Sequence, residues 1–174
     1  MSDDTELERI YDEHADGLFA FLLNFLRNEQ DARDLLQEVF VRIARQPGLL
    51  RRSRDERTYL LGLAHNAAVD WMRRRAAREK YHERSAGLAA VFAASDNPDE
   101  EKFREALSQA LAKLPEEQRA VVHLKLWEDL TFEQIAETLA ISPNTAASRY
   151  RYGLDKLRDH LRPLYEEIHE SRRI

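Results

Sequence analysis

The sequence predicts an all-α protein with two small helical domains joined by a flexible linker. Ala, Leu, Glu and Arg, which favour helices, are abundant, whereas glycine and proline each occur only five times in 174 residues. Apolar residues recur at helical spacing in segments that prolines and capping residues separate. With 43% hydrophobic residues, the chain can bury a core in each domain.

Three helices are expected in the first domain, over residues 5–28, 28–46 and 53–75. The first and third begin with capping boxes, in which Thr or Ser is followed three residues later by Glu. The second carries one apolar stripe over residues 32–43 and ends at Pro47. The residues expected to cap these three helices are Thr5, Asn28 and Ser53.

Four further helices are expected to begin at Pro98, Pro115, Thr131 and Pro143. Proline suits the first turn of a helix, where its missing N–H group is not needed. The helix at Thr131 opens with a capping box that Gln134 completes. These four helices form the second domain.

The stretch before the fourth helix, residues 85–96, is almost without charge, since Asp96 is its one charged residue, and it lacks a clear helix signal. Such a change in composition indicates a boundary between domains. We therefore expect a first domain over residues 1–84, a linker over 85–97 and a second domain over 98–174.

The net charge of −5 is unevenly distributed along the chain. Counting Lys and Arg against Asp and Glu, residues 1–48 carry −6, 49–84 carry +5, 85–139 carry −6 and 140–174 carry +2. The two basic segments are expected to contact phosphate, and the acidic remainder predicts weak DNA affinity for the protein alone.

Several classes of protein are disfavoured by composition. The chain has no cysteine, which excludes disulfides and thiolate metal sites, and its six histidines show no metal-ligand spacing. We therefore expect no catalytic residue, metal, cofactor or small-molecule substrate, and no enzymatic activity. No apolar run approaches the roughly 20 residues of a membrane span, so a cytoplasmic location without a membrane span is expected.

Residues 131–161 have the spacing of a helix-turn-helix: a short apolar helix, a tight turn at 140–142, and a helix whose start is small and polar. Small polar side chains there can reach base edges in a major groove, whereas an unpartnered surface helix more often carries Glu and Lys. The alternative is a helix pair that only completes a bundle. The residues expected at the DNA are Ser142, Asn144, Thr145, Ala147, Ser148, Arg149 and Arg151.

Two blocks in the first domain resemble region 2 of sigma factors: Asp31-x-x-Asp34-Leu35-x-Gln37-Glu38-Val39-Phe40, and the segment from Arg57 to Arg75. The helix-turn-helix resembles region 4. Both regions occur in order with a short linker, which is similar to the extracytoplasmic-function (ECF) group of the sigma-70 family. The resemblance implies a transcription initiation factor that binds core RNA polymerase at the β′ clamp and β flap, binds promoter DNA, and is restrained by an anti-sigma factor.

The resemblance also assigns roles to residues of the first domain. The acidic helix is expected to dock on polymerase, although most such faces are only solvated. The segment that follows is expected to hold the −10 element and its separated strand, since it combines arginines, an aromatic ring and an amide. Asn66 and Asp70 could instead brace a neighbouring helix, and the arginines could be a solvated helix end. The polymerase residues are Asp31, Asp34, Leu35, Gln37, Glu38 and Phe40; the −10 residues are Arg51, Arg52, Arg54, Arg57, Tyr59, Asn66, Asp70, Arg73, Arg74 and Arg75.

The sequence departs from the family pattern in its recognition helix. Ala147 stands where a basic residue is frequent, and Gly153 is expected to interrupt the helix at about 1 kcal/mol relative to alanine. The −35 preference of relatives therefore does not transfer. The alternative function is a stand-alone helix-turn-helix regulator, which would bind DNA without polymerase.

Overall fold

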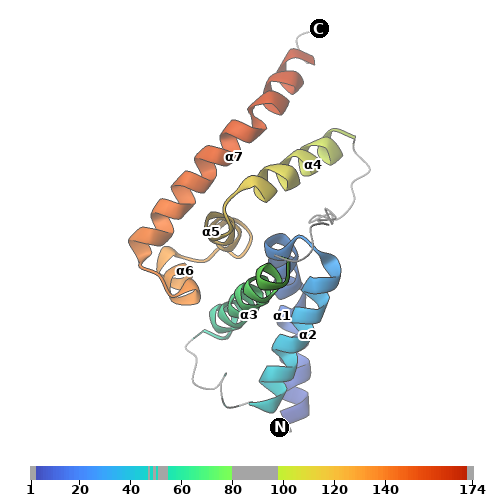
Figure 1. Ribbon diagram of the computed structural model, residues 1–174, viewed down its shortest axis with the longest axis vertical. Helices are drawn as coiled ribbons and strands as arrows, with labels where there is room; N and C mark the ends of the chain where they lie inside the picture. The colour runs from blue at the N-terminus through green and yellow to red at the C-terminus, as the bar shows by residue number, and fades with distance from the viewer. Residues whose placement is uncertain (1–2, 47, 49, 51–54, 80–97, 172–174) are drawn as a thin grey trace.

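The computed structural model describes residues 3–46, 48, 50, 55–79 and 98–171, and these residues form seven α-helices without strands (Figure 1). The expected linker, residues 85–97, lies outside the described residues, as do Arg51, Arg52 and Arg54. The helices are α1 Asp3–Leu26, α2 Glu29–Arg45, α3 Glu56–Glu79, α4 Pro98–Lys113, α5 Glu116–Leu126, α6 Phe132–Leu139 and α7 Pro143–Ser171. The predicted all-α class and the seven helices are confirmed.

Helices α1, α2 and α3 pack together around an apolar core. The stripe predicted on α2 faces this core, with Ala32, Leu35, Val39 and Ile43 buried. Helix α1 contributes Phe21 and Leu22, whose side chains are fully buried. Removing such side chains from water supplies most of the stability of the first domain.

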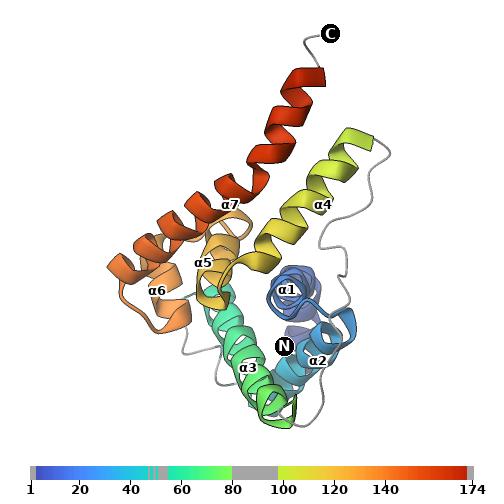
Figure 2. The same cartoon turned by 45° about the horizontal axis from the view of Figure 1, so that its top comes forward.

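Helices α4 to α7 form the second domain, in which α7 contacts α4, α5 and α6. A smaller core between α4, α5 and α7 contains Leu111, Val122 and Leu157. In both views the last part of α7 extends beyond the other helices (Figures 1 and 2).

The two domains pack directly against each other, an arrangement that the sequence leaves open. Helix α3 contacts α6, and α1 contacts α5, so that α5 lies between α7 and the helices of the first domain (Figures 1 and 2). One continuous core joins Leu60 and Ala64 of α3 to Leu124 and Ile135 of the second domain. We call this contact the seam, and its apolar interior indicates a cohesive closed arrangement.

Of the three caps predicted for the helices of the first domain, one is found in the structure. Asn28 caps α2, because its side chain accepts a hydrogen bond from the Asp31 N–H. Thr5 does not cap α1, which begins two residues earlier at Asp3. Ser53 lies outside the described residues, and the cap of α3 is supplied by Asp55, which accepts hydrogen bonds from the backbone and hydroxyl of Thr58 at 3.3 and 2.6 Å.

The prediction that Gly153 interrupts the recognition helix is wrong, because α7 runs without a break from Pro143 to Ser171 and also contains Pro163. The reason for glycine lies in packing. A Cβ atom at position 153 would stand 2.7 Å from Cγ2 of Val122 on α5. Glycine therefore permits the close approach of α7 to α5, and that contact compensates for its low helix propensity.

Candidate functional site

The helix-turn-helix is built from α6, a short turn and the start of α7. Thr131 and Gln134 form the predicted capping box at the start of α6. The helix ends at Ala140, whose backbone is left-handed at φ 53°. The N–H of Ile141 then donates to the Ala136 carbonyl at 3.0 Å, which closes the turn and directs the chain into α7.

Six of the seven residues predicted to face DNA lie in the first turns of α7, and the seventh, Ser142, directly precedes the helix. Ser142, Asn144 and Arg151 are exposed, whereas the other four are half-buried. Ser142 caps the helix by accepting the Thr145 N–H at 3.0 Å. Arg149 lies 3.6 Å from the carboxylate of Glu117 on α5, so this guanidinium is paired within the second domain. The half-buried residues are Thr145, Ala147, Ser148 and Arg149.

The acidic helix α2 presents an exposed polar face. Asp34, Gln37 and Glu38 are exposed on it, while Leu35 and Phe40 are buried beneath it. Leu35 and Phe40 therefore support this face from the core. Asp31 is half-buried and pairs with Arg75 of α3 at 3.3 Å; burial raises its pKa, and Arg75 partly offsets this effect.

On α3, four of the predicted −10 residues follow helical spacing along one face: Tyr59, Asn66, Asp70 and Arg73. Tyr59 is half-buried against the core, whereas the other three are exposed. Arg74 is also exposed, and Arg75 is half-buried with its guanidinium over the ring of Trp71. These described residues thus form a polar and partly basic face along α3, and their role at the −10 element stays a prediction.

Arg57 is differently placed, because it crosses the seam. Its guanidinium donates to the carboxylate of Glu128, on the connection between α5 and α6. Glu128 is buried beside Gly17 of α1 and also contacts His123 at 3.5 Å. Burial raises the pKa of Glu128, but the contacts with His123 and Arg57 together lower it by a larger amount. The pKa of Glu128 therefore lies below the usual carboxyl value.

The polar contacts continue across the seam on both sides of Glu128. His123 is buried and shares a hydrogen bond of 2.9 Å with Asn24 of α1. Gln134, in the capping box of α6, also donates to Asp55 at 3.0 Å. Sequence patterns do not identify these contacts, because Glu128 and His123 carry no motif and their partners lie about 70 to 100 residues away.

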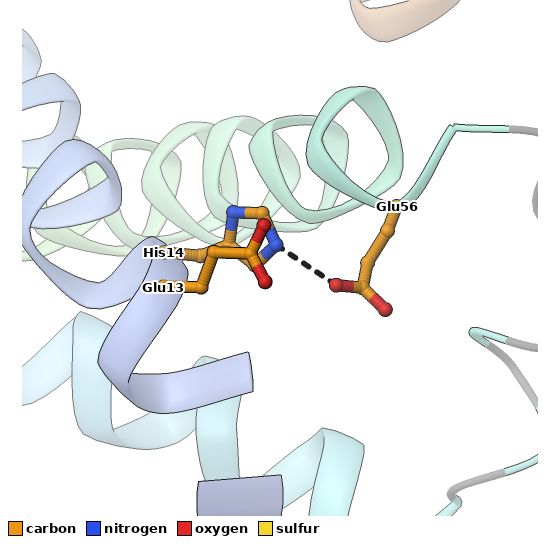
Figure 3. Close-up of side chains that lie close together, drawn as sticks. All are labelled: Glu13, His14 and Glu56. Carbon is orange, nitrogen blue, oxygen red and sulfur yellow. Dashed lines mark hydrogen bonds and ion pairs between the residues drawn. The ribbon is translucent and has the colours of Figure 1, made fainter. Parts of the chain in front are cut away.

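A cluster of Glu13, His14 and Glu56 lies at the edge of the first domain, with possible ligand atoms within 4.8 Å of one another (Figure 3). His14 Nε2 stands 2.8 Å from Glu56. Arg9 pairs with both carboxylates, at 2.8 Å to Glu13 and 2.9 Å to Glu56. Since Arg9 already balances their charge, the cluster is an ion-pair network that braces the start of α3 against α1.

An apolar groove of about 600 Å³ lies between the start of α4 and the last part of α7. Phe103 and Tyr165 are 46% and 64% exposed there, although large apolar side chains are usually buried.

A search of the described helices for a membrane-spanning segment finds none with the necessary length and apolar character.

Residues 10–78 match the family description of sigma-70 region 2, and residues 104–157 match sigma-70 region 4. The RNA polymerase sigma factor CarQ of Myxococcus xanthus is 32% identical over 92% of each chain. The ECF RNA polymerase sigma factor SigX of Bacillus subtilis is 28% identical, covering 91% of this chain and 85% of its own. The ECF sigma factor SigL of Mycobacterium tuberculosis is 31% identical over 91% and 90%.

A solved structure supports the same fold. The sigma factor RpoE of Bartonella quintana, in complex with the anti-sigma factor NepR, superposes with a TM-score of 0.71 at 20% identity, covering 91% of this chain and 96% of that chain. Both sigma regions are present here in order, and full-length relatives exceed 30% identity. The chain therefore belongs to the ECF group of the sigma-70 family of RNA polymerase sigma factors.

Proposed function

We propose that this sigma factor docks on the β′ clamp of core RNA polymerase through the exposed face of α2. Asp34, Gln37 and Glu38 share that face, and the opposite side of the helix is fixed in the core by Leu35 and Val39. A rigidly held acidic face suits a basic partner surface, because little conformational entropy is lost on docking.

The first domain, residues 1–84, is proposed to hold the −10 element and its separated strand along α3. Support comes from the shared face of Tyr59, Asn66 and Arg73, which offers a ring for stacking, an amide for base edges and a cation for phosphate. Arg74 extends the basic surface. The same role is proposed, from the sequence alone, for Arg51, Arg52 and Arg54.

The second domain, residues 98–174 after the linker 85–97, is proposed to recognise the −35 element with the start of α7. Exposed Asn144 and Arg151 are the side chains best placed for base edges and phosphate. Arg149 can join them only by leaving Glu117. The groove with Phe103 and Tyr165 offers an apolar surface for the β flap.

Regulation by an anti-sigma factor is part of the proposal. The related RpoE of Bartonella quintana was solved with such a partner. In the closed arrangement described here, Arg57 is already paired with Glu128, so a partner that favours this arrangement withholds the donors of that pair, Nε and one terminal nitrogen, from DNA. The protein is proposed to act in the cytoplasm, where polymerase and promoters are found, and to catalyse no reaction itself.

The observation that carries the proposal is the joint presence of an exposed acidic helix face and an ordered helix-turn-helix in one chain with both sigma regions. Run-off transcription with purified core polymerase and promoter fragments from the source genome tests it. Asp34→Lys with Glu38→Lys is expected to abolish initiation. The control is Asp12→Lys with Asp16→Lys, an equal charge change at exposed positions of α1, which is expected to retain it.

The sigma-factor relatives support this function and not the alternative that the sequence suggests, a stand-alone helix-turn-helix regulator. That alternative predicts tight, sequence-specific binding by the protein alone and no initiation when polymerase is added. That outcome would overturn the sigma assignment of these surfaces. Loss of initiation in both charge variants would overturn the specific role of α2.

A further inference from the structure

A cavity of about 660 Å³ opens at the seam between the two domains. Its wall combines the end of α1, the last turns of α3 and the start of α5. Of the described residues, four arginines and a single carboxylate, Glu116, line it. The volume is typical of a small-molecule site. The lining arginines are Arg27, Arg73, Arg75 and Arg119.

Two of these arginines are buried and, among the residues that the structure describes, form no ion pair with a carboxylate. Arg27 and Arg119 are only 9% and 6% exposed. Arg27 donates to the carbonyl and hydroxyl of Ser108 at 2.9 and 3.3 Å, and Arg119 donates to the carbonyls of Phe25 and Ala112 at 3.2 and 3.3 Å. Within the described ranges, neither forms an ion pair, and each keeps a buried Nε without a hydrogen-bond acceptor.

Their mutual position makes the charge more costly. Burial lowers the pKa of Arg119, and the neighbouring Arg27 lowers it again, while Glu116 opposes both effects. Burial also lowers the pKa of Arg27. Buried charges in proteins are usually paired. Two adjacent guanidinium groups beside a cavity, with no ion pair to any described residue, therefore indicate a place for an anion.

We propose that this cavity binds a small anion with two or more phosphate groups, either inorganic pyrophosphate or a nucleoside polyphosphate. Guanidinium groups match phosphate oxygens in geometry and charge. Exposed Arg73 adds a third cation at the rim, while Arg75 is engaged by Asp31. Apolar Val69 and Met72 line the same cavity and offer a wall for a nucleoside ring.

Because the cavity lies between the two domains, a ligand bound there would affect how the domains are arranged. Arg27 and Arg73 belong to the first domain and Arg119 to the second. An anion that contacts both sides binds the closed arrangement better than an open one, so it shifts the protein toward closure. This regulatory site goes beyond the proposed function, and its ligand can be detected without polymerase or promoter DNA.

Isothermal titration of the full chain with pyrophosphate and, separately, with ATP, both without magnesium, tests the binding. One ligand per chain is expected. Arg73→Gln and Arg119→Gln are each expected to weaken binding, raising the dissociation constant by about tenfold or more. Arg73→Gln is informative even if Arg119→Gln fails to fold, because Arg73 is exposed and does not hold the seam. Arg74→Gln, in the same basic run but outside the cavity, is the matched control.

The two ligand sources are separated by comparing affinities and fluorescence. Tighter binding of ATP, with a change in Trp71 fluorescence in a Trp127→Phe background, identifies a nucleoside polyphosphate. Equal affinity for both identifies the polyphosphate group alone. Binding no stronger than that of sulfate at equal ionic strength, or equal weakening by Arg74→Gln and Arg73→Gln, would overturn the proposal.

Closure is measured separately. Because the chain has no cysteine, spin labels can be placed at exposed positions with Arg45→Cys and Asp159→Cys, one on each domain. Pyrophosphate is expected to raise the population at the shorter label distance, and Arg73→Gln is expected to remove this response. An unchanged distance distribution at saturating ligand would overturn the coupling between anion and closure.

Discussion

Glu128 of the second domain and Arg57 of the first form an ion pair in which the carboxylate is almost completely buried. Arg57 is one of the residues that the family resemblance assigns to promoter DNA. Its Nε and one terminal nitrogen both donate to Glu128, so in the closed arrangement these two donors are not available to phosphate. Opening of the seam releases them and leaves the whole guanidinium for DNA.

Loss of this ion pair is expected to weaken the seam. Glu128→Gln leaves Arg57 without its buried counter-charge, so the free energy of unfolding should fall by about 1–3 kcal/mol. Urea unfolding of Arg57→Gln, Glu128→Gln and the double variant measures the coupling. The double variant should cost less than the sum of the two single changes. Additive losses would show that the pair contributes no coupling, and Glu137→Gln, at an exposed carboxylate of α6, is the control.

Gly153→Ala is expected to destabilise the protein although alanine is the better helix former. The added methyl group would meet Val122 at 2.7 Å, and such overpacking costs about 1–3 kcal/mol, which exceeds the gain of roughly 1 kcal/mol in helix propensity. Thermal unfolding measures the difference. Combining the change with Val122→Ala should recover part of the loss, whereas a more stable single variant would contradict the close contact.

The sequence pattern predicted the positions of the helices better than the way in which they pack together. The helical spacing of apolar residues and the capping residues were sufficient for α2 and for the helix-turn-helix, because Asn28 and Thr131 act through neighbours in the chain. They failed at Thr5, where the helix begins earlier. They also failed at Gly153, because its reason is a contact with another helix.

For the candidate site, the sequence pattern indicated an exposed acidic face on α2 but not how the predicted site residues are paired or how many of them are half-buried. Asp34 and Glu38 are exposed as the acidic face requires. The partners of Arg57 and Arg149 are carboxylates whose positions depend on tertiary packing. Glu128 could not be found from local pattern, since its burial arises only when α1, α3 and α5 come together.

Ala140→Gly is expected to stabilise the helix-turn-helix. Ala140 has φ 53°, a left-handed conformation that costs a residue with a Cβ atom about 1 kcal/mol and costs glycine little. The melting temperature should therefore rise by a few degrees, in proportion to that free energy. Ala147→Gly, within a right-handed helical turn, is the control and should lower stability by about 1 kcal/mol. A decrease in both variants would contradict the strain at Ala140.

The stability of the closed arrangement is expected to fall as pH decreases below the ordinary histidine pKa, because of His65. Burial lowers the pKa of His65 from 6.5, Asn66 partly opposes this, and Arg149 of the second domain lowers it further. The folded protein thus favours neutral His65, while the unfolded chain takes up a proton below about pH 6.5. This contribution is complete above pH 6.5 and is lost as pH falls toward the lower folded pKa, at up to about 1.4 kcal/mol per pH unit.

Urea unfolding between pH 7.5 and 5.5 measures this loss, and His65→Gln should make the decline shallower than in the unmodified protein. His160→Gln is the matched control, since His160 is exposed on α7. Protonated His65 would face Arg149 across the seam and hold a buried Nδ1 donor without a partner among the described residues. Acid should therefore also lengthen the distance between labels on the two domains. An equal decline in all three proteins would show that other groups cause the pH dependence.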